Sequence, residues 1–212
     1  MNIHTETNSQ QILKPKNNFY NFIINPFSFF NNMLSNPKVM LPLLIMFIAN
    51  VLFSFTSADL LYQGNNYIND SFIQNNRTIF MVLTVGISVI SNLTTLIFSC
   101  LFLYFIGMIF FDNISYKTIF SFVLFSQIPQ YINLFILTAK NLITQEITEQ
   151  IQNPTLLDSI GTQVNPFNIW HLFLLGVAIH TMTKMSKTKS FIIILILPIL
   201  NISLPQILTN IF

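Results

Sequence analysis

Long apolar runs alternate with short polar segments along this chain. Because the hydrocarbon core of a bilayer is about 30 Å thick, a helix of roughly 20 apolar residues can cross it. Five runs reach that length, and the charged residues fall almost wholly outside them. The pattern predicts an all-α, polytopic integral membrane protein with five transmembrane helices, at about residues 39–58, 78–111, 119–139, 166–183 and 190–211.

The second run is the ambiguous one, because residues 78–111 would form a helix of about 51 Å. Two shorter spans would need a turn at membrane depth, and its only candidates are Gly86 and the pair Ser91-Asn92. A single span instead puts Lys117 and the lysines of residues 184–189 on the side of the amino terminus, as the positive-inside rule favours. We predict one long helix, a cytoplasmic amino terminus and a carboxyl terminus outside.

The chain divides into three predicted regions. Residues 1–18 are polar and predict a disordered tail, residues 19–38 predict a cytoplasmic interfacial helix, and residues 39–212 predict the membrane domain. Asn25 and Pro26 are typical of a helix start.

The predicted interfacial helix is amphipathic. Phe27, Phe30 and Leu34 share one face when residues 26–34 are helical. This pattern favours a helix on the cytoplasmic membrane surface, with a segment that fills a partner's groove as the alternative.

Composition removes several classes of function. Only 8% of the residues are charged and the net charge is +2, so nucleic-acid binding is not expected. His171 and His180 lie on opposite sides of one predicted helix and cannot share a metal ion, and His171 next to Trp170 indicates an interfacial anchor. The chain shows no paired carboxylates, nucleophile elbow or phosphate-binding glycine loop. We therefore expect no cofactor, no metal and no enzymatic activity.

Polar side chains inside the second run recur three or four residues apart. Ser88, Ser91, Asn92 and Thr95 lie along one side of the predicted helix. In lipid, hydroxyl and amide groups of this kind bond across helix interfaces, so the side is predicted to face protein. The alternative is a substrate path lined by these groups.

A proline interrupts the third run. Pro129 removes a backbone donor and predicts a kink near the middle of the span. Gln127, Gln130 and Asn133 then lie on the kinked face, where they either bond to the second span or line a cavity.

Three blocks resemble the Yip-one family, the five-span proteins named for interaction with Ypt/Rab GTPases, in its bacterial branch. They are Asn25-Pro26-Phe27 with Asn36-Pro37 before the first span, Asp112 to Pro129, and Asn165-Pro166-Phe167-Asn168-Ile169-Trp170. The resemblance implies five spans and a role in membrane organisation or trafficking-like assembly. The chain lacks the long amino-terminal region through which eukaryotic members are thought to engage Rab proteins, so Rab binding is not carried over.

These features lead to one preferred function and two alternatives. The preferred function is a non-enzymatic membrane scaffold or adaptor in a bacterial cytoplasmic membrane, where it contacts the lipid bilayer and a membrane-protein partner or a second copy. The first alternative is a transporter or permease-like component that moves a small solute or lipid. The second is a lipid-binding or bilayer-remodelling protein that acts through its interfacial helix.

Overall fold

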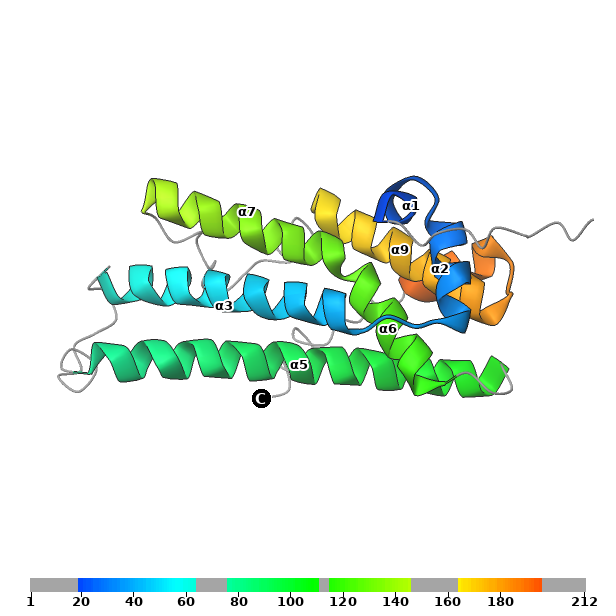
Figure 1. Ribbon diagram of the computed structural model, residues 1–212, viewed down its shortest axis with the longest axis horizontal. Coiled ribbons are helices and arrows are strands. Elements are labelled where there is room, and N and C mark those ends of the chain that lie inside the picture. Colours follow the sequence, from blue (N-terminus) through cyan, green and yellow to red (C-terminus); the bar gives the residue numbers. More distant parts are fainter. Residues whose placement is uncertain (1–18, 64–75, 111–114, 146–163, 196–212) are drawn as a thin grey trace, which may run out of the picture.

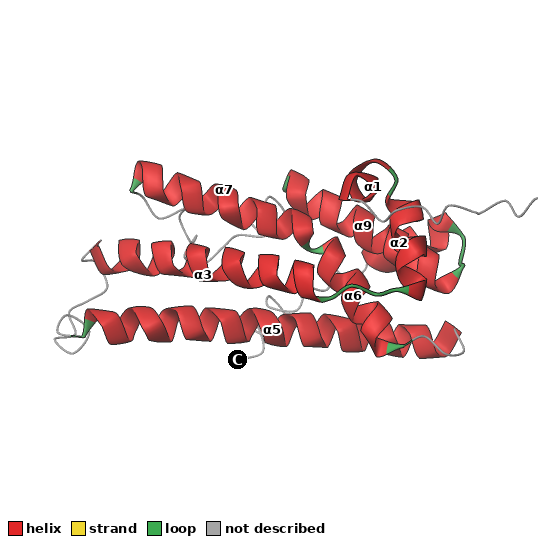
Figure 2. Cartoon of the chain, in the orientation of Figure 1, coloured by secondary structure: helices red, strands yellow, loops and turns green. Residues whose placement is uncertain are grey.

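The structure, a computed structural model, describes residues 19–63, 76–110, 115–145 and 164–195, and every regular element in these ranges is a helix (Figure 2). The predicted all-α class is therefore confirmed for the described part of the chain. The predicted tail at residues 1–18 lies outside it. The helices are α1 (Phe19–Ile24), α2 (Pro26–Ser35), α3 (Met40–Gln63), α5 (Arg77–Phe110), α6 (Tyr116–Ser126), α7 (Ile128–Thr144) and α9 (Pro166–Thr183), followed by helical residues 187–195.

The helices form an elongated bundle (Figure 1). Helices α3, α5 and α7 run side by side, with α3 packed against both α5 and α7. Helix α6 leads away from α7 toward one end of the molecule, where α1, α2 and α9 gather. We call the group α1, α2, α6 and α9 the aromatic end, and the part formed by residues 47–63 of α3 and 77–90 of α5 the open end.

Three stretches are long and apolar enough to cross a membrane. They are Met40–Tyr62, Arg77–Phe105 and Tyr116–Thr144, the last of which joins α6 and α7. They correspond to the first three predicted spans. Helix α5 is one continuous helix, which confirms the single long helix over the second run. The fourth predicted span coincides with α9, which is not among the three stretches, and the fifth is described only to residue 195.

Closely packed rings form the core of the aromatic end. Phe22, Phe30 and Phe122 are fully buried. The ring of Phe30 lies 5.0 Å from that of Phe122, and the ring of Phe22 lies 6.3 Å from that of Trp170. Edge-to-face rings at such distances add to the free energy gained by apolar contact. Helices distant in sequence are thereby held together at this end.

Helix α2 begins as the sequence predicts but buries a different face. The Asn25 side chain accepts a hydrogen bond from the Ser28 N–H at 3.2 Å, and Pro26 occupies the first turn. The buried residues are Pro26, Phe29, Phe30 and Met33. Leu34, predicted on the apolar face, is 37% exposed. The buried face is rotated by about one residue, or about 100°, from the predicted one because α2 packs against α9 and α6.

Candidate helix-packing site

The third predicted span is broken at Gln127. This residue ends α6 and begins α7, and its N–H donates to the Val123 carbonyl at 3.1 Å. Pro129 is buried in the first turn of α7, where its missing N–H does not disrupt the helix. The predicted kink is confirmed, and α6 and α7 point along visibly different axes (Figure 1).

The break leaves a backbone carbonyl for α9 to satisfy. The Gln130 N–H donates to the Gln127 carbonyl at 2.9 Å, although a continuous helix would pair it with Ser126. The His171 Nδ1 lies 2.9 Å from the Ser126 oxygen. Since a carbonyl oxygen only accepts, this Nδ1 carries the proton and donates it. The sequence analysis predicts that His171 anchors the chain at the lipid headgroups, and it does not predict this contact with the Ser126 carbonyl.

A second polar contact joins the same two helices. The Gln130 Nε2 donates to the Asn168 Oδ1 at 2.8 Å, one turn of α9 before His171. A buried or half-buried amide costs free energy unless it is paired, so this bond fixes the register of α9 against α7. Gln130 therefore contacts the fourth predicted span, and not the second as one sequence interpretation had it.

The other two polar residues of the kinked face, Gln127 and Asn133, differ in their hydrogen bonding. The Gln127 Oε1 accepts a hydrogen bond from the buried Tyr131 hydroxyl at 2.7 Å. The Asn133 side chain is half-buried in α7 and forms no hydrogen bond with the part of the chain that the structure describes. Gln127 thus stabilises the break from within its own segment.

One hydroxyl pair joins α3 and α5. The Ser54 hydroxyl donates to the Ser88 Oγ at 2.6 Å, and Ser54 is only 4% exposed. Small side chains let two helices approach closely in lipid, and a hydroxyl pair adds a directional bond at that point. Ser88 is therefore the member of the predicted α5 row that faces a neighbouring helix.

The remaining members of that row lie on the surface. Ser91, Asn92 and Thr95 are exposed in this single chain. The Asn92 Nδ2 donates to the Ser88 carbonyl at 3.0 Å, and the Thr95 hydroxyl donates to the Ser91 carbonyl at 3.0 Å. Polar groups paired within their own helix can face lipid at a lower free-energy cost than unpaired ones. Their predicted role in contact with protein stays a prediction.

The open end contains an apolar groove of about 770 Å³ between α3 and α5. Its α3 wall is Phe47, Val51 and Phe55. Its α5 wall is apolar from Met81 to Ile90, and Arg77 and Thr78 lie at one end. None of the eight residues that the sequence analysis predicts for helix packing or a cavity lines it.

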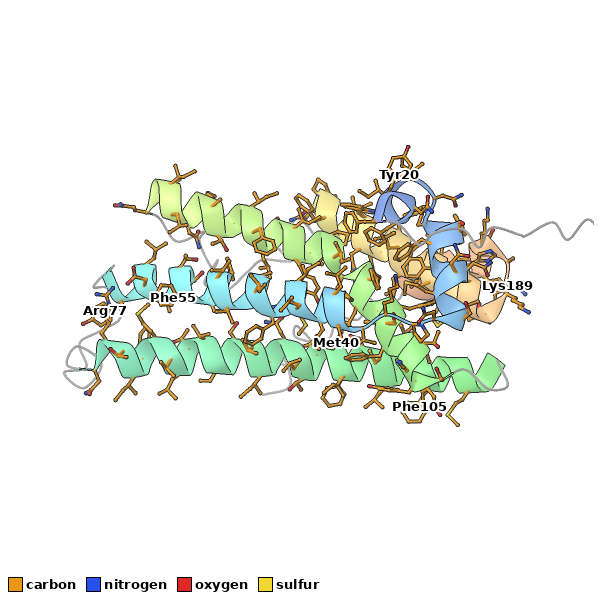
Figure 3. The ribbon with its side chains drawn as sticks, in the orientation of Figure 1. Tyr20, Met40, Phe55, Arg77, Phe105 and Lys189 are labelled. Carbon is orange, nitrogen blue, oxygen red and sulfur yellow. The ribbon has the colours of Figure 1, made fainter. Side chains whose placement is uncertain are left out.

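An ion pair stands at the end of the groove. The Arg77 guanidinium donates to the Asp59 carboxylate and also lies 5.2 Å from the centre of the Tyr62 ring. These contacts join the last turns of α3 to the first turn of α5. Figure 3 labels Arg77 at the extremity of the bundle and Phe55 along the same helix pair.

Sequence reasoning missed several residues whose side chains bond to another helix. They include Ser54, Asn168 and His171, and also Asn141 of α7, which donates to Ser57 of α3. Asn168 and His171 lie three residues apart and so share one face of α9, and this face packs against the break between α6 and α7. Within the described residues, no three side chains of His, Cys, Asp or Glu lie close enough to hold a metal ion.

The described ranges are all-helical and contain three apolar stretches of membrane-crossing length, which defines a multi-pass membrane protein. A family model described as the Yip1 domain matches residues 20–206. The match covers most of the sequence, and the chain belongs to this family, whose members are membrane proteins not known as enzymes. Comparison with curated proteins and with solved structures finds no match.

Proposed function

We propose that the chain is a non-enzymatic membrane scaffold or adaptor that binds other membrane proteins or a second copy of itself. In this proposal five helices span a bacterial cytoplasmic membrane, with the amino terminus inside and the carboxyl terminus outside. The role is membrane organisation or a trafficking-like assembly, in keeping with membership of the Yip1 family.

The observation that carries the proposal is the exposed polar row on α5. Only 11% of the most apolar part of α5 is buried within the chain, against 56% of the most apolar part of the α6–α7 stretch. Ser91, Asn92 and Thr95 lie together on this exposed helix. In lipid, an interface with small polar residues allows close backbone approach and hydrogen bonds between helices. The row therefore has the chemistry of a helix-association surface.

Transport remains the second candidate, supported by the break in α6–α7 and by the groove. A path for a polar solute needs polar or ionisable lining at membrane depth. The groove is apolar along most of its length, and the polar residues of the break bond to neighbouring helices. These contacts favour an assembly function over solute movement.

The test changes two residues of the exposed row and leaves the Ser54–Ser88 contact between α3 and α5 intact. Asn92→Leu combined with Thr95→Leu should reduce recovery of the partner, or of a differently tagged second copy, after crosslinking in intact cells. The matched control is Thr94→Leu, because Thr94 is also exposed but lies about 160° around α5 from Asn92 and about 100° from Thr95. We expect the control to keep full recovery. Equal recovery from the double variant and the control, at equal expression, would rule out the row as the association surface.

A further inference from the structure

We propose that the groove at the open end holds an acyl chain of a bilayer phospholipid, whose phosphate binds Arg77. The groove lies between α3 and α5, and its walls are apolar except where Arg77 and Thr78 mark one end. An amphipathic ligand with a long apolar part and a single polar head matches this distribution.

The length of the groove fits one leaflet. Its α5 wall runs from Arg77 to Ile90, which corresponds to about 20 Å of helix. One leaflet, with its headgroup region, contributes half of a bilayer of about 40–45 Å. An acyl chain that follows α5 from the membrane surface would therefore end near the inner limit of the groove.

Gly86 keeps the groove open. A Cβ atom built on Gly86 would meet no atom within 4 Å, so the missing side chain faces open space. Glycine in the middle of a helix is costly relative to alanine. Here it widens the groove midway along the α5 wall, where the chain of a lipid would pass.

The positive charge of Arg77 indicates that the headgroup of the ligand carries a negative charge. The Arg77 side chain is 51% exposed, and one of its terminal nitrogens donates to Asp59. A guanidinium carries five N–H donors in a planar fork, a geometry that suits phosphate oxygens. The contacts with Asp59 and Tyr62 hold the fork at the groove end, so its remaining donors are positioned before a headgroup arrives.

The proposal is tested on the full-length chain in vesicles of phosphatidylethanolamine and phosphatidylglycerol. After extraction into mild detergent, native mass spectrometry measures the phospholipid that stays bound. The wild-type chain should retain a single phospholipid, and Gly86→Leu should abolish its retention by filling the groove. Ile87→Phe, which adds bulk on the opposite side of α5, should retain as much as the wild type. Equal retention by Gly86→Leu and Ile87→Phe overturns the proposal.

Two further variants separate the phosphate contact from the ion pair. Arg77→Gln should lower retention by about tenfold, because it removes a charge-assisted hydrogen bond. Asp59→Asn removes the ion pair but keeps the guanidinium and its contact with the Tyr62 ring, so its retention should fall much less than that of Arg77→Gln. An equal loss in both variants would overturn the assignment of the headgroup to Arg77.

The occupant is identified directly in the wild-type chain. A phosphatidylethanolamine with a diazirine in its acyl chain, retained through extraction and then illuminated, should label Met81 and Val85. These positions line the groove. If a photoreactive amino acid placed at Met81 or Val85 instead crosslinks to a second copy or to residues 196–212, the groove is assigned to protein and the lipid proposal is overturned. Folding of every variant is checked by size-exclusion elution and circular dichroism.

Discussion

The aromatic end and the open end differ in how much of their apolar surface is covered by the rest of the chain. At the aromatic end Phe22, Phe30 and Phe122 have no exposed surface, and their rings bridge helices from both halves of the sequence. At the open end Phe47 and Phe55 are each about half exposed, at 51% and 52%. Water would penalise such exposure, but lipid tails are as apolar as the side chains themselves. The chain itself therefore supplies the packing partner at the aromatic end, whereas the half-exposed rings of the open end have the apolar character of a lipid-facing surface.

The largest contrast is expected from removing one ring at each kind of site. Phe30→Ala should lower the free energy of unfolding by about 3–5 kcal/mol, because it leaves a cavity among buried rings. Phe55→Ala removes a ring that is 52% exposed at the open end and should cost far less. Reversible unfolding in mixed lipid–detergent micelles measures both. Similar losses from the two variants would contradict the distinction between the ends.

The two ends should also respond oppositely to alanine at a glycine. A Cβ on Gly176 would lie 2.5 Å from the Phe191 Cε1, so Gly176→Ala should cost about 1–3 kcal/mol by forcing that ring aside. A Cβ on Gly86 meets open space, so Gly86→Ala should stabilise α5 by roughly 1 kcal/mol through helix propensity. Thermal unfolding of both variants tests the opposite signs.

The control for the Gly176 experiment is a compensating change. Adding Phe191→Leu to Gly176→Ala removes the ring that the new methyl group would strike, so the double variant should recover part of the loss. If it unfolds at the same temperature as Gly176→Ala alone, the clash with Phe191 is not the cause.

The smallest expected effect is at the hydroxyl pair of the open end. Ser54→Ala should lose the bond to Ser88, for a coupling free energy of about 0.6 kcal/mol, the average found for hydrogen bonds between membrane helices. A double-mutant cycle with Ser88→Ala measures that coupling. A value near zero would mean that apolar contact alone joins α3 to α5.

Local patterns predicted the elements well. Apolar run length predicted the continuous α5, and Pro129 predicted the break that the structure places at Gln127. Both depend on properties of a single segment: the reach of a helix, and a missing backbone donor. Asn25 likewise acts as the cap of α2, because capping involves only neighbouring residues.

Contacts between segments were beyond the reach of these patterns. The polar row on α5 predicted one interface, but among the described residues only Ser88 of the four bonds to another helix. Its partner Ser54 lies in an apolar run where nothing marks it as special. The buried face of α2 was displaced for the same reason, since its periodicity indicates an apolar stripe but not which protein surface will cover part of it.

The ring contacts between the two halves of the sequence also set an order of events during synthesis. Phe22 meets the ring of Trp170, which a ribosome adds on the order of ten seconds later at typical rates of chain elongation. Until then α1 and α2 have no α9 to pack against. The rings of α1 and α2 that face α9 therefore stay without that cover during this interval, and the mature packing can form only after α9 has been synthesised.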